Sequence, residues 1–318
     1  MGGPGLPIPP DAEGGPNTST KRGDRIFAGV SRGAGLVIML ALAGVFVFLA
    51  VEGFPGISQP ATNYAPETTF WPYVGKLLFG TIFAAVIALV IAVPFALGIA
   101  LFIAIYAPRR IAVPVAYVID LLAAVPSVVF GLWGAFTLAK HLTPMYQWLY
   151  DHFSWIPLFK GPPSATGRTL LTAGLVLAIM ILPIITAISR EIFAQTPRLH
   201  REAAMALGAT RWEMVRLTVF PYARSGIVSA VMLGLGRALG ETMAVAIVLS
   251  ASPLTTINII SSNNPATIAS NIANKFAEAT PAQLHVLIAT GLALFALTFV
   301  VNFAARAIVG RAEKRLAG

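Results

Sequence analysis

The chain contains no cysteine among its 318 residues. Disulfide bonds and thiolate metal ligands are therefore excluded. Charged residues are also scarce: they make up 11% of the chain, whereas about 25% is usual for a soluble domain. Hydrophobic residues make up 57%. A water-soluble core cannot bury so much apolar surface, so we expect the lipid bilayer to be the solvent for most of the chain.

The chain also lacks the glycine-rich loop with which many ATP-binding proteins hold phosphates. Its one Gly-Lys pair, Gly75-Lys76, is followed by Leu77, and no glycine stands five residues before Gly75. Any ATP and Mg²⁺ would therefore be bound by a partner. The four histidines have no spacing typical of a metal site: His141, His152, His200 and His285. No convincing Ser/Thr-His-Asp constellation is present, so we expect no catalytic residue, no metal site, no cofactor bound by this chain and no enzymatic activity of its own.

Six stretches are long and apolar enough to cross about 30 Å of hydrocarbon. They cover residues 30–51, 75–106, 114–139, 168–189, 222–250 and 284–308. We therefore expect an all-α polytopic membrane protein with six transmembrane helices and no inserted soluble domain. Residues 1–28 are rich in glycine and proline and are predicted to form a disordered tail, followed by a membrane domain over residues 29–318. The first span begins too late and runs too long for a cleaved signal peptide.

The basic residues alternate between the two sides of the predicted spans. Sixteen of the 22 lysines and arginines lie before the first span, between spans two and three, between spans four and five, or after the last span. Basic residues collect on the cytoplasmic side, so both termini and the loop near residues 196–221 are expected in the cytoplasm of a multi-pass cell-membrane protein. The net charge of +9 then reflects topology and contact with anionic lipid, and no pattern suggests a nucleic-acid partner.

Two of the connections on the other side carry a signal. Residues 140–167 are rich in aromatic side chains, which either anchor a span at the headgroup layer or belong to a short amphipathic helix. Residues 251–283 contain serine, asparagine and proline and are expected to form a turn-rich linker.

The predicted loop between spans four and five has a regular pattern. Glu202, Ala203 and Ala204 are followed by Gly208 and, thirteen residues later, by Pro221. Gly208 can end one short helix, and Pro221 fits the first turn of the next. Small residues would allow the backbone of a partner to approach closely. The alternative is an ordinary amphipathic loop helix without a partner.

This loop resembles the cytoplasmic "EAA" loop of ABC importer permeases, which docks on an ATP-hydrolysing subunit. The family pattern is Glu-Ala-Ala, three residues, Gly, nine residues, an aliphatic residue, one residue and Leu-Pro. Here Thr218 and Phe220 replace the aliphatic residue and the leucine. The resemblance implies that Glu202, Ala203, Ala204 and Gly208 couple this chain to an ATPase.

Two charges lie inside the fifth predicted span. Arg237 is about fifteen residues from its start, which is roughly 22 Å along a helix. Facing lipid at that depth would cost about 2.5 kcal/mol or more, so Arg237 is expected to face protein or water. Glu241, four residues on, would lie on the same helical face. The two residues form either a buried structural ion pair or an anion site, because guanidinium matches the oxygens of phosphate.

Two segments resemble the PstC-type permease of phosphate ABC importers: residues 236–245, which include Arg237 and Glu241, and residues 120–134. This resemblance implies a type I ABC permease fold and a phosphate importer. Its partners would be a second permease (PstA-type) in a heterodimer, two ATPase subunits (PstB-type) and an external phosphate-binding protein (PstS-type). Arg237, Glu241 and Thr242 are then the candidate substrate-path residues, with Asp120 and Ser127 as further candidates. Asp120 alone could instead bind a neighbouring helix or be protonated.

Three other functions stay open at this point. The first is a permease of the same class for sulfate or molybdate. The second is a secondary anion transporter, which would contain an inverted repeat with broken helices. The third is a membrane enzyme acting on lipid phosphates, which the missing catalytic constellation disfavours.

Overall fold

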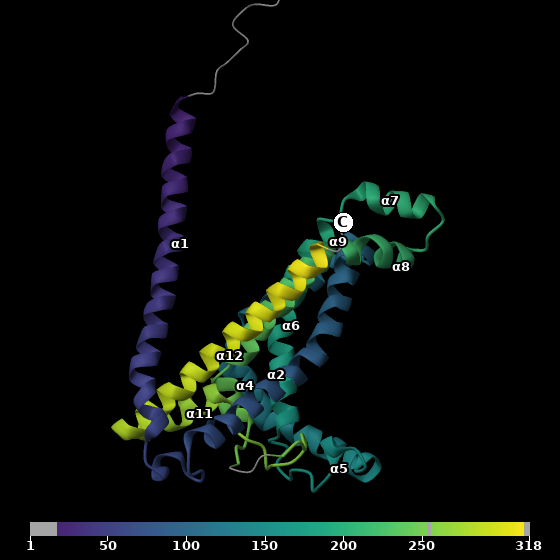
Figure 1. Cartoon of the computed structure of the whole chain (residues 1–318). Coiled ribbons are helices and arrows are strands. Elements are labelled where there is room, and N and C mark those ends of the chain that lie inside the picture. Colours follow the sequence, from purple (N-terminus) through teal and green to yellow (C-terminus); the bar gives the residue numbers. More distant parts are fainter. Residues whose placement is uncertain (1–17, 253–255, 315–318) are drawn as a thin grey trace, which may run out of the picture.

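The computed structural model of the protein describes residues 18–252 and 256–314. This part of the chain is almost entirely helical (Figure 1). Five segments are long and apolar enough to cross a membrane, and a bent pair makes a sixth. They are built on α1 (Thr18–Gly53), α2 (Phe70–Leu101), the pair α3 (Arg109–Ala124) and α4 (Ser127–Trp133), α6 (Leu170–Ala194), α9 (Phe220–Gly240) and α12 (Pro281–Lys314). The expected all-α architecture with six apolar segments is confirmed.

Shorter elements connect these helices. The α-helical ones are α5 (Ala139–Phe153), α7 (Arg198–Ala206), α8 (Arg211–Met214), α10 (Met243–Val248) and α11 (Ile268–Lys275). The 3₁₀ turns are η1 (Phe54–Ser58), η2 (Ala61–Tyr64), η5 (Pro157–Phe159) and η7 (Phe276–Glu278). Three π-helical turns continue neighbouring helices: η3 (Phe102–Tyr106), η4 (Gly134–Leu138) and η6 (Val215–Val219).

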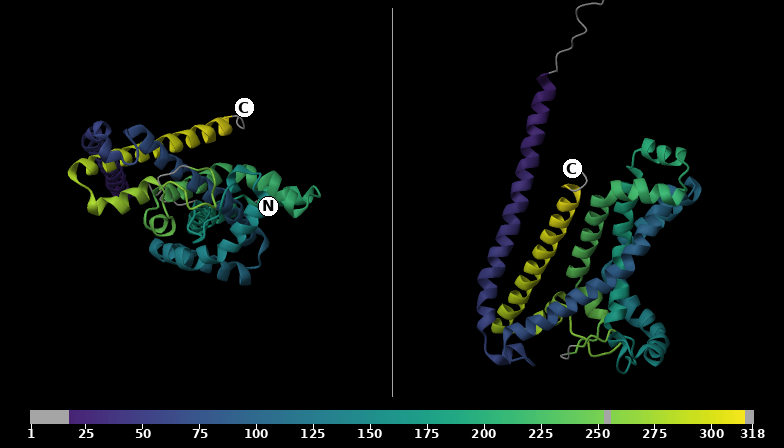
Figure 2. Two further views of the ribbon diagram at one scale, coloured as in Figure 1. Left: turned by 90° about the horizontal axis from the view of Figure 1, so that it is seen from below. Right: turned by 45° about the vertical axis from the view of Figure 1, so that its right-hand side comes forward.

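The two ends of the molecule carry different elements. The start of α1, the end of α12 and α7 lie at one end, whereas α5 and α11 lie at the other (Figure 1 and Figure 2, right). We call these the α7 end and the α5 end. α1 begins at Thr18, so residues 18–28 of the segment expected to be disordered are helical. Residues 1–17 of that predicted tail lie outside the described residues.

The centre of the bundle is the packing of α2 against α6. α2 presents a buried alanine every four residues, which places them on one helical face: Ala84, Ala88, Ala92 and Ala96. Larger buried side chains of α6, such as Ile181 and Ile185, belong to the same apolar cluster. Small residues let membrane helices approach closely. Dispersion contacts in this ridge therefore hold the two helices together.

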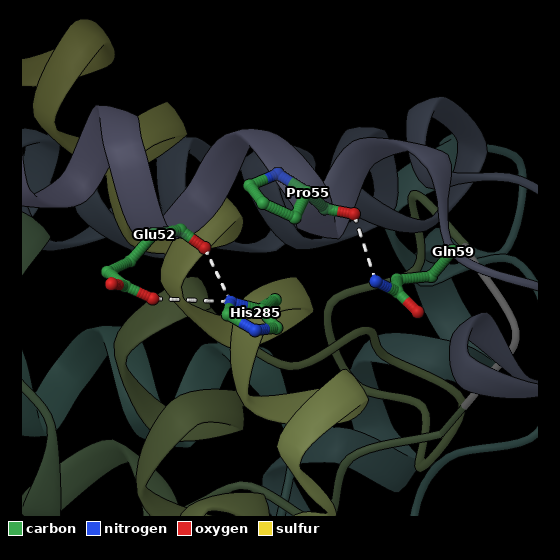
Figure 3. A network of polar contacts seen from close by, with 4 residues as sticks. All are labelled: Glu52, Pro55, Gln59 and His285. Atoms are coloured by element: carbon green, nitrogen blue, oxygen red, sulfur yellow. Dashed lines mark hydrogen bonds and ion pairs between the residues drawn. The ribbon is translucent and has the colours of Figure 1, made fainter.

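α1 is attached to the rest of the bundle near the α5 end. The rings of Phe46 on α1 and Phe295 on α12 are 5.6 Å apart. Earlier side chains of α1 are exposed; Leu40, for example, is 71% exposed. Nδ1 of His285 lies 2.8 Å from the backbone oxygen of Glu52 and 3.5 Å from its carboxylate oxygen Oε2 (Figure 3). One polar contact and a short apolar stretch thus fix this helix.

The turn after α1 continues this attachment. Nε2 of Gln59 donates to the backbone oxygen of Pro55 at 3.0 Å (Figure 3). Gly56 approaches α12 so closely that a Cβ there would lie 2.2 Å from the backbone oxygen of His285. A glycine is therefore required where η1 crosses α12.

The third predicted span is not one straight helix. α3 ends at Ala124, and the helix that starts at Ser127 is inclined to it by 92°. Pro126 disfavours helical geometry at the preceding residue, and Val125 is extended with ψ 128°. The expectation of a single helix over residues 114–139 was wrong, because Pro126 divides this span into two separate helices.

The fifth predicted span is also interrupted, and the expectation of one helix over residues 222–250 was wrong. α9 ends at Gly240, and Glu241 leaves the helix with φ −68° and ψ 121°. A new helix, α10, begins at Met243. No proline causes this break. The α10 segment instead packs across α4, where a Cβ at Gly131 would lie 2.8 Å from the Cα of Ala244. Tertiary packing thus overrides local helix continuation.

The connections at the α5 end are more structured than expected. Residues 139–153 form helix α5, the amphipathic-helix alternative for the aromatic-rich loop. Residues 256–283 are not a plain linker: the side chain of Asn264 is buried, accepts from the amide of Leu170 at 3.2 Å and donates to the oxygen of Asn258 at 2.7 Å. This segment therefore closes the start of α6.

We expect the α4–α10 contact to be sensitive to volume. Gly131→Val should lower the free energy of unfolding by about 1–3 kcal/mol, because the new side chain would force α4 and α10 apart. Thermal denaturation of the purified chain in detergent measures this change. Gly98→Val is the matched control, since a Cβ at Gly98 meets nothing within 4 Å. Equal melting temperatures for the two variants would contradict the tight contact.

Candidate functional site

The strongest candidate residues lie at the break between α9 and α10. Arg237 is half-buried in the last turn of α9, where the helix dipole favours a cation. Glu241 follows the helix end, and its Oε1 accepts from the amide of Ala244 at 3.1 Å. Thr242 Oγ1 donates to the backbone oxygen of Gly240 at 3.1 Å. The side chains of Glu241 and Thr242 thus stabilise the backbone where α9 ends and α10 begins.

Arg237 and Glu241 do not form the expected pair on one helical face. The helix ends between them, and no ion pair joins their side chains among the described residues. The prediction of a shared face was wrong because it assumed a continuous helix. Glu241 is used to stabilise the start of α10, and Arg237 has no carboxylate partner within residues 18–252 and 256–314. Its donors can therefore serve a ligand.

Arg237 lines a groove of about 710 Å³ between three helices. One residue comes from α6, six from α9 and four from α12: Ile184, Val228, Ser229, Met232, Leu233, Gly236, Arg237, Asn302, Ala305, Arg306 and Gly310. α9 and α12 run alongside one another in the right-hand view of Figure 2. The groove places a guanidinium in mostly apolar surroundings and opens at the surface of the described bundle, where Gly236 and Arg306 are exposed.

Asp120 has a different neighbour from Arg237. Its Oδ2 lies 3.7 Å from Nη2 of Arg190 on α6, and its side chain is 53% exposed. This ion pair joins α3 to α6, which agrees with the expectation of a neighbouring-helix partner rather than a protonated acid. Arg190 was not singled out from the sequence as the partner of Asp120, because the two residues are 70 positions apart in the chain. Ser127 begins α4 and is half-buried.

The structure adds a residue that sequence reasoning did not single out. Arg168 precedes α6, and its guanidinium donates to the backbone oxygens of Ile247 and Val248, with Nε 3.4 Å from the latter. These are the last carbonyls of α10, where a helix lacks its own donors and a cation is favoured. Arg168 therefore fixes one end of α10 while Glu241 fixes the other. The sequence gives no signal for this contact because the partners are backbone atoms.

The loop between α6 and α9 contains the expected helix and turn. α7 ends in a Schellman motif: Gly208 has φ +86°, its amide donates to the oxygen of Met205 at 3.0 Å, and the amide of Ala209 donates to the oxygen of Ala204 at 3.1 Å. Gly208 thus ends one short helix, as predicted. The side chains of Glu202 and Ala203 are exposed.

The next helix begins earlier than the sequence indicated. Thr210 caps α8 through a capping box with Glu213, so the helix starts at Arg211 rather than at Pro221. It continues without a sharp bend through η6 into α9. The π-helical turn accommodates the missing amide of Pro221, which lies directly behind it.

This loop exposes a large apolar surface. Four side chains are more than half exposed: Leu199, Leu207, Trp212 and Leu217. Leu207, beside Gly208, is 90% exposed. Exposed apolar patches rimmed by charges mark protein interaction sites. The loop can therefore contact another protein.

Removal of the Arg168 contacts should loosen α10. We expect Arg168→Gln to lower the free energy of unfolding by about 2 kcal/mol, because two carbonyls lose a charged donor. Hydrogen exchange should quicken at the α10 amides. Arg168→Lys should be intermediate, and Arg109→Gln, which removes an exposed charge, should change neither quantity. Unchanged exchange in α10 for Arg168→Gln would contradict the assigned role.

The chain is similar to known membrane transport proteins over most of its length. Residues 96–316 match the family described as "Binding-protein-dependent transport system inner membrane component". A protein of Mycobacterium tuberculosis named "Phosphate transport system permease protein PstC 2" is 47% identical over 302 residues, covering 91% of this chain and 93% of that protein. "Phosphate transport system permease protein PstC" of Xylella fastidiosa (strain Temecula1) is 37% identical over 320 residues and 98% of both chains.

Solved structures support the fold. A bacterial ABC transporter described as importing the acidic polysaccharide alginate has a chain with TM-score 0.53 and 18% identity, covering 90% of this chain and 99% of that one. A chain of the MetNI methionine ABC transporter, in inward-facing conformations, has TM-score 0.50 and 18% identity, covering 75% and 94%. With a family match over more than two thirds of its length and close relatives along nearly all of it, the chain belongs to the binding-protein-dependent transport system inner membrane components, the permease subunits of ABC importers.

Proposed function

We propose that this chain is the membrane subunit that carries inorganic phosphate through an ATP-driven importer. It is a transport subunit and not an enzyme. The observation that carries the substrate assignment is Arg237, a guanidinium without a carboxylate partner in the described part of the chain, on a groove between α6, α9 and α12. The names of its relatives support phosphate as the anion.

The chemistry of the break between α9 and α10 fits a phosphate path. Guanidinium offers two parallel N–H donors to two oxygens of one anion. Glu241 holds α10 and adds a negative charge next to the path, where a carboxylate can accept a hydrogen bond from a protonated phosphate oxygen. A fully deprotonated sulfate has no such proton. Thr242 is a further polar group at the break, and Ser127 and Asp120 are additional candidates for this path.

We infer that the α7 end lies in the cytoplasm and contacts an ATPase. Both termini of the described chain and the arginines of α7 and α8 lie at this end, as the positive-inside rule requires. Glu202, Ala203, Ala204 and Gly208 provide the coupling surface, together with the exposed Leu207. ATP and Mg²⁺ would be bound by two PstB-type partner subunits. A PstA-type permease would complete the path, and a PstS-type binding protein would deliver phosphate.

The first test removes the guanidinium. Arg237→Gln in the assembled importer should lower ATP-driven phosphate uptake at least about tenfold, because a charge-assisted hydrogen bond is lost. Radioactive phosphate uptake into vesicles measures this, with co-purification of the partner subunits as the assembly control. If the variant fails to assemble, Arg237 is structural. Competition by sulfate but not by arsenate in the wild type would favour another oxyanion.

The second test concerns the turn after α7. Gly208→Val should weaken ATPase co-purification and phosphate uptake, because a β-branched residue at φ +86° is strained and would unwind the turn. Gly208→Asn is the matched control, since asparagine tolerates left-handed backbone geometry, and it should retain most of both activities. Normal ATPase binding and uptake by Gly208→Val would remove the loop from the coupling mechanism.

A further inference from the structure

A second arginine reaches the groove beside Arg237. On α9 the lining residues from Val228 to Arg237 recur with helical spacing, so they form one face of that helix. On α12, Asn302, Ala305 and Arg306 are three and four residues apart and form a face of their own. Two helices that are distant in the sequence therefore direct one arginine each into the same groove.

The charge of this groove is not balanced by the residues that line it. Among the residues whose side chains the structure describes, none that lines the groove is an aspartate or glutamate. Arg306 forms neither a hydrogen bond nor an ion pair with another described residue. Arg237 likewise has no carboxylate partner among the described residues. Two like charges in a mostly apolar groove attract an anion strongly, because apolar walls focus the field.

The groove also contains the space and the polar groups that an anion needs. Gly236 lies beside Arg237, and a Cβ at this position would meet no atom within 4 Å. Asn302 supplies a side-chain amide along the wall, whereas the hydroxyl of Ser229 donates to the backbone oxygen of Ser225 at 3.0 Å. At about 710 Å³ the groove has room for a hydrated oxyanion.

We propose that Arg306 and Asn302 of α12 extend the Arg237 site into an oxyanion-binding groove between α9 and α12. This inference rests on the proposed function, because it gives the transported anion a second binding site, on the α7 side of Arg237. Arg306 lies nearer the end of α12 at the α7 end, so an anion leaving Arg237 in that direction passes it. The group that is bound is a phosphate-type oxyanion, either inorganic phosphate or the headgroup of an anionic lipid.

The test uses the importer, purified with its partner subunits, in vesicles of two compositions: phosphatidylcholine alone, or phosphatidylcholine with phosphatidylglycerol. We expect Arg306→Gln to lower the rate of phosphate uptake about tenfold, the effect of one lost charge-assisted hydrogen bond. Arg110→Gln is the matched control, because Arg110 is also an exposed arginine of the α7 end but does not line the groove. Gly236→Leu, whose Cβ would meet no atom of the described chain within 4 Å, would narrow the groove and should reduce uptake as well.

The two lipid compositions distinguish the sources of the phosphate group. A loss with Arg306→Gln in both identifies inorganic phosphate as the occupant, whereas a loss only with phosphatidylglycerol identifies a lipid headgroup. Uptake by Arg306→Gln equal to that of wild type and Arg110→Gln in both vesicles overturns the proposal. If the wild type takes up sulfate instead of phosphate and Arg306→Gln slows it, the phosphate assignment fails while the oxyanion groove stands.

Discussion

The close crossing of α4 and α10 is the contact on which the geometry of the candidate site depends. Both helices are short continuations of interrupted spans, and neither can bury its surface alone. At Gly131 and Ala244 their backbones meet without an intervening side chain. The interruptions leave backbone groups unpaired in a medium without water, where each must find a partner. Glu241 and Arg168 supply partners at the two ends of α10.

The arginines of the bundle fall into distinct groups by their partners. Arg190 is paired with Asp120 and joins α3 to α6. Arg168 is paired with carbonyl oxygens and completes a helix. Arg237 has neither kind of partner in the described chain and lies on a groove. A guanidinium already saturated by protein oxygens has few donors left for an anion, so the absence of a counter-charge distinguishes Arg237 from the other two arginines.

Sequence reasoning was most accurate where the signal is local. Six apolar segments and the turn at Gly208 follow from composition and from a single glycine. The break after Ala124 has a local cause, Pro126, which was not used in predicting the third span. The break at Glu241 has no local cause, so the expected pairing with Arg237 failed with it. Arg168 and Arg306 could not be assigned, because their surroundings come from elements 79 and about 70 residues away that only the folded chain brings together.

The uninterrupted helix from Arg211 to Gly240 has a mechanical meaning. It joins the exposed loop to Arg237 over 26 residues, which corresponds to roughly 39 Å at about 1.5 Å per residue. In a helix of that length, a small change of tilt at one end produces a large displacement of the other end. Tilting it by about 5° would displace one end against the other by on the order of 3 Å, comparable to one hydrogen-bond length. A small rotation imposed at α8 would therefore move Arg237 by about one hydrogen-bond length, and the π-helical turn at Val215–Val219 lies within the moving helix.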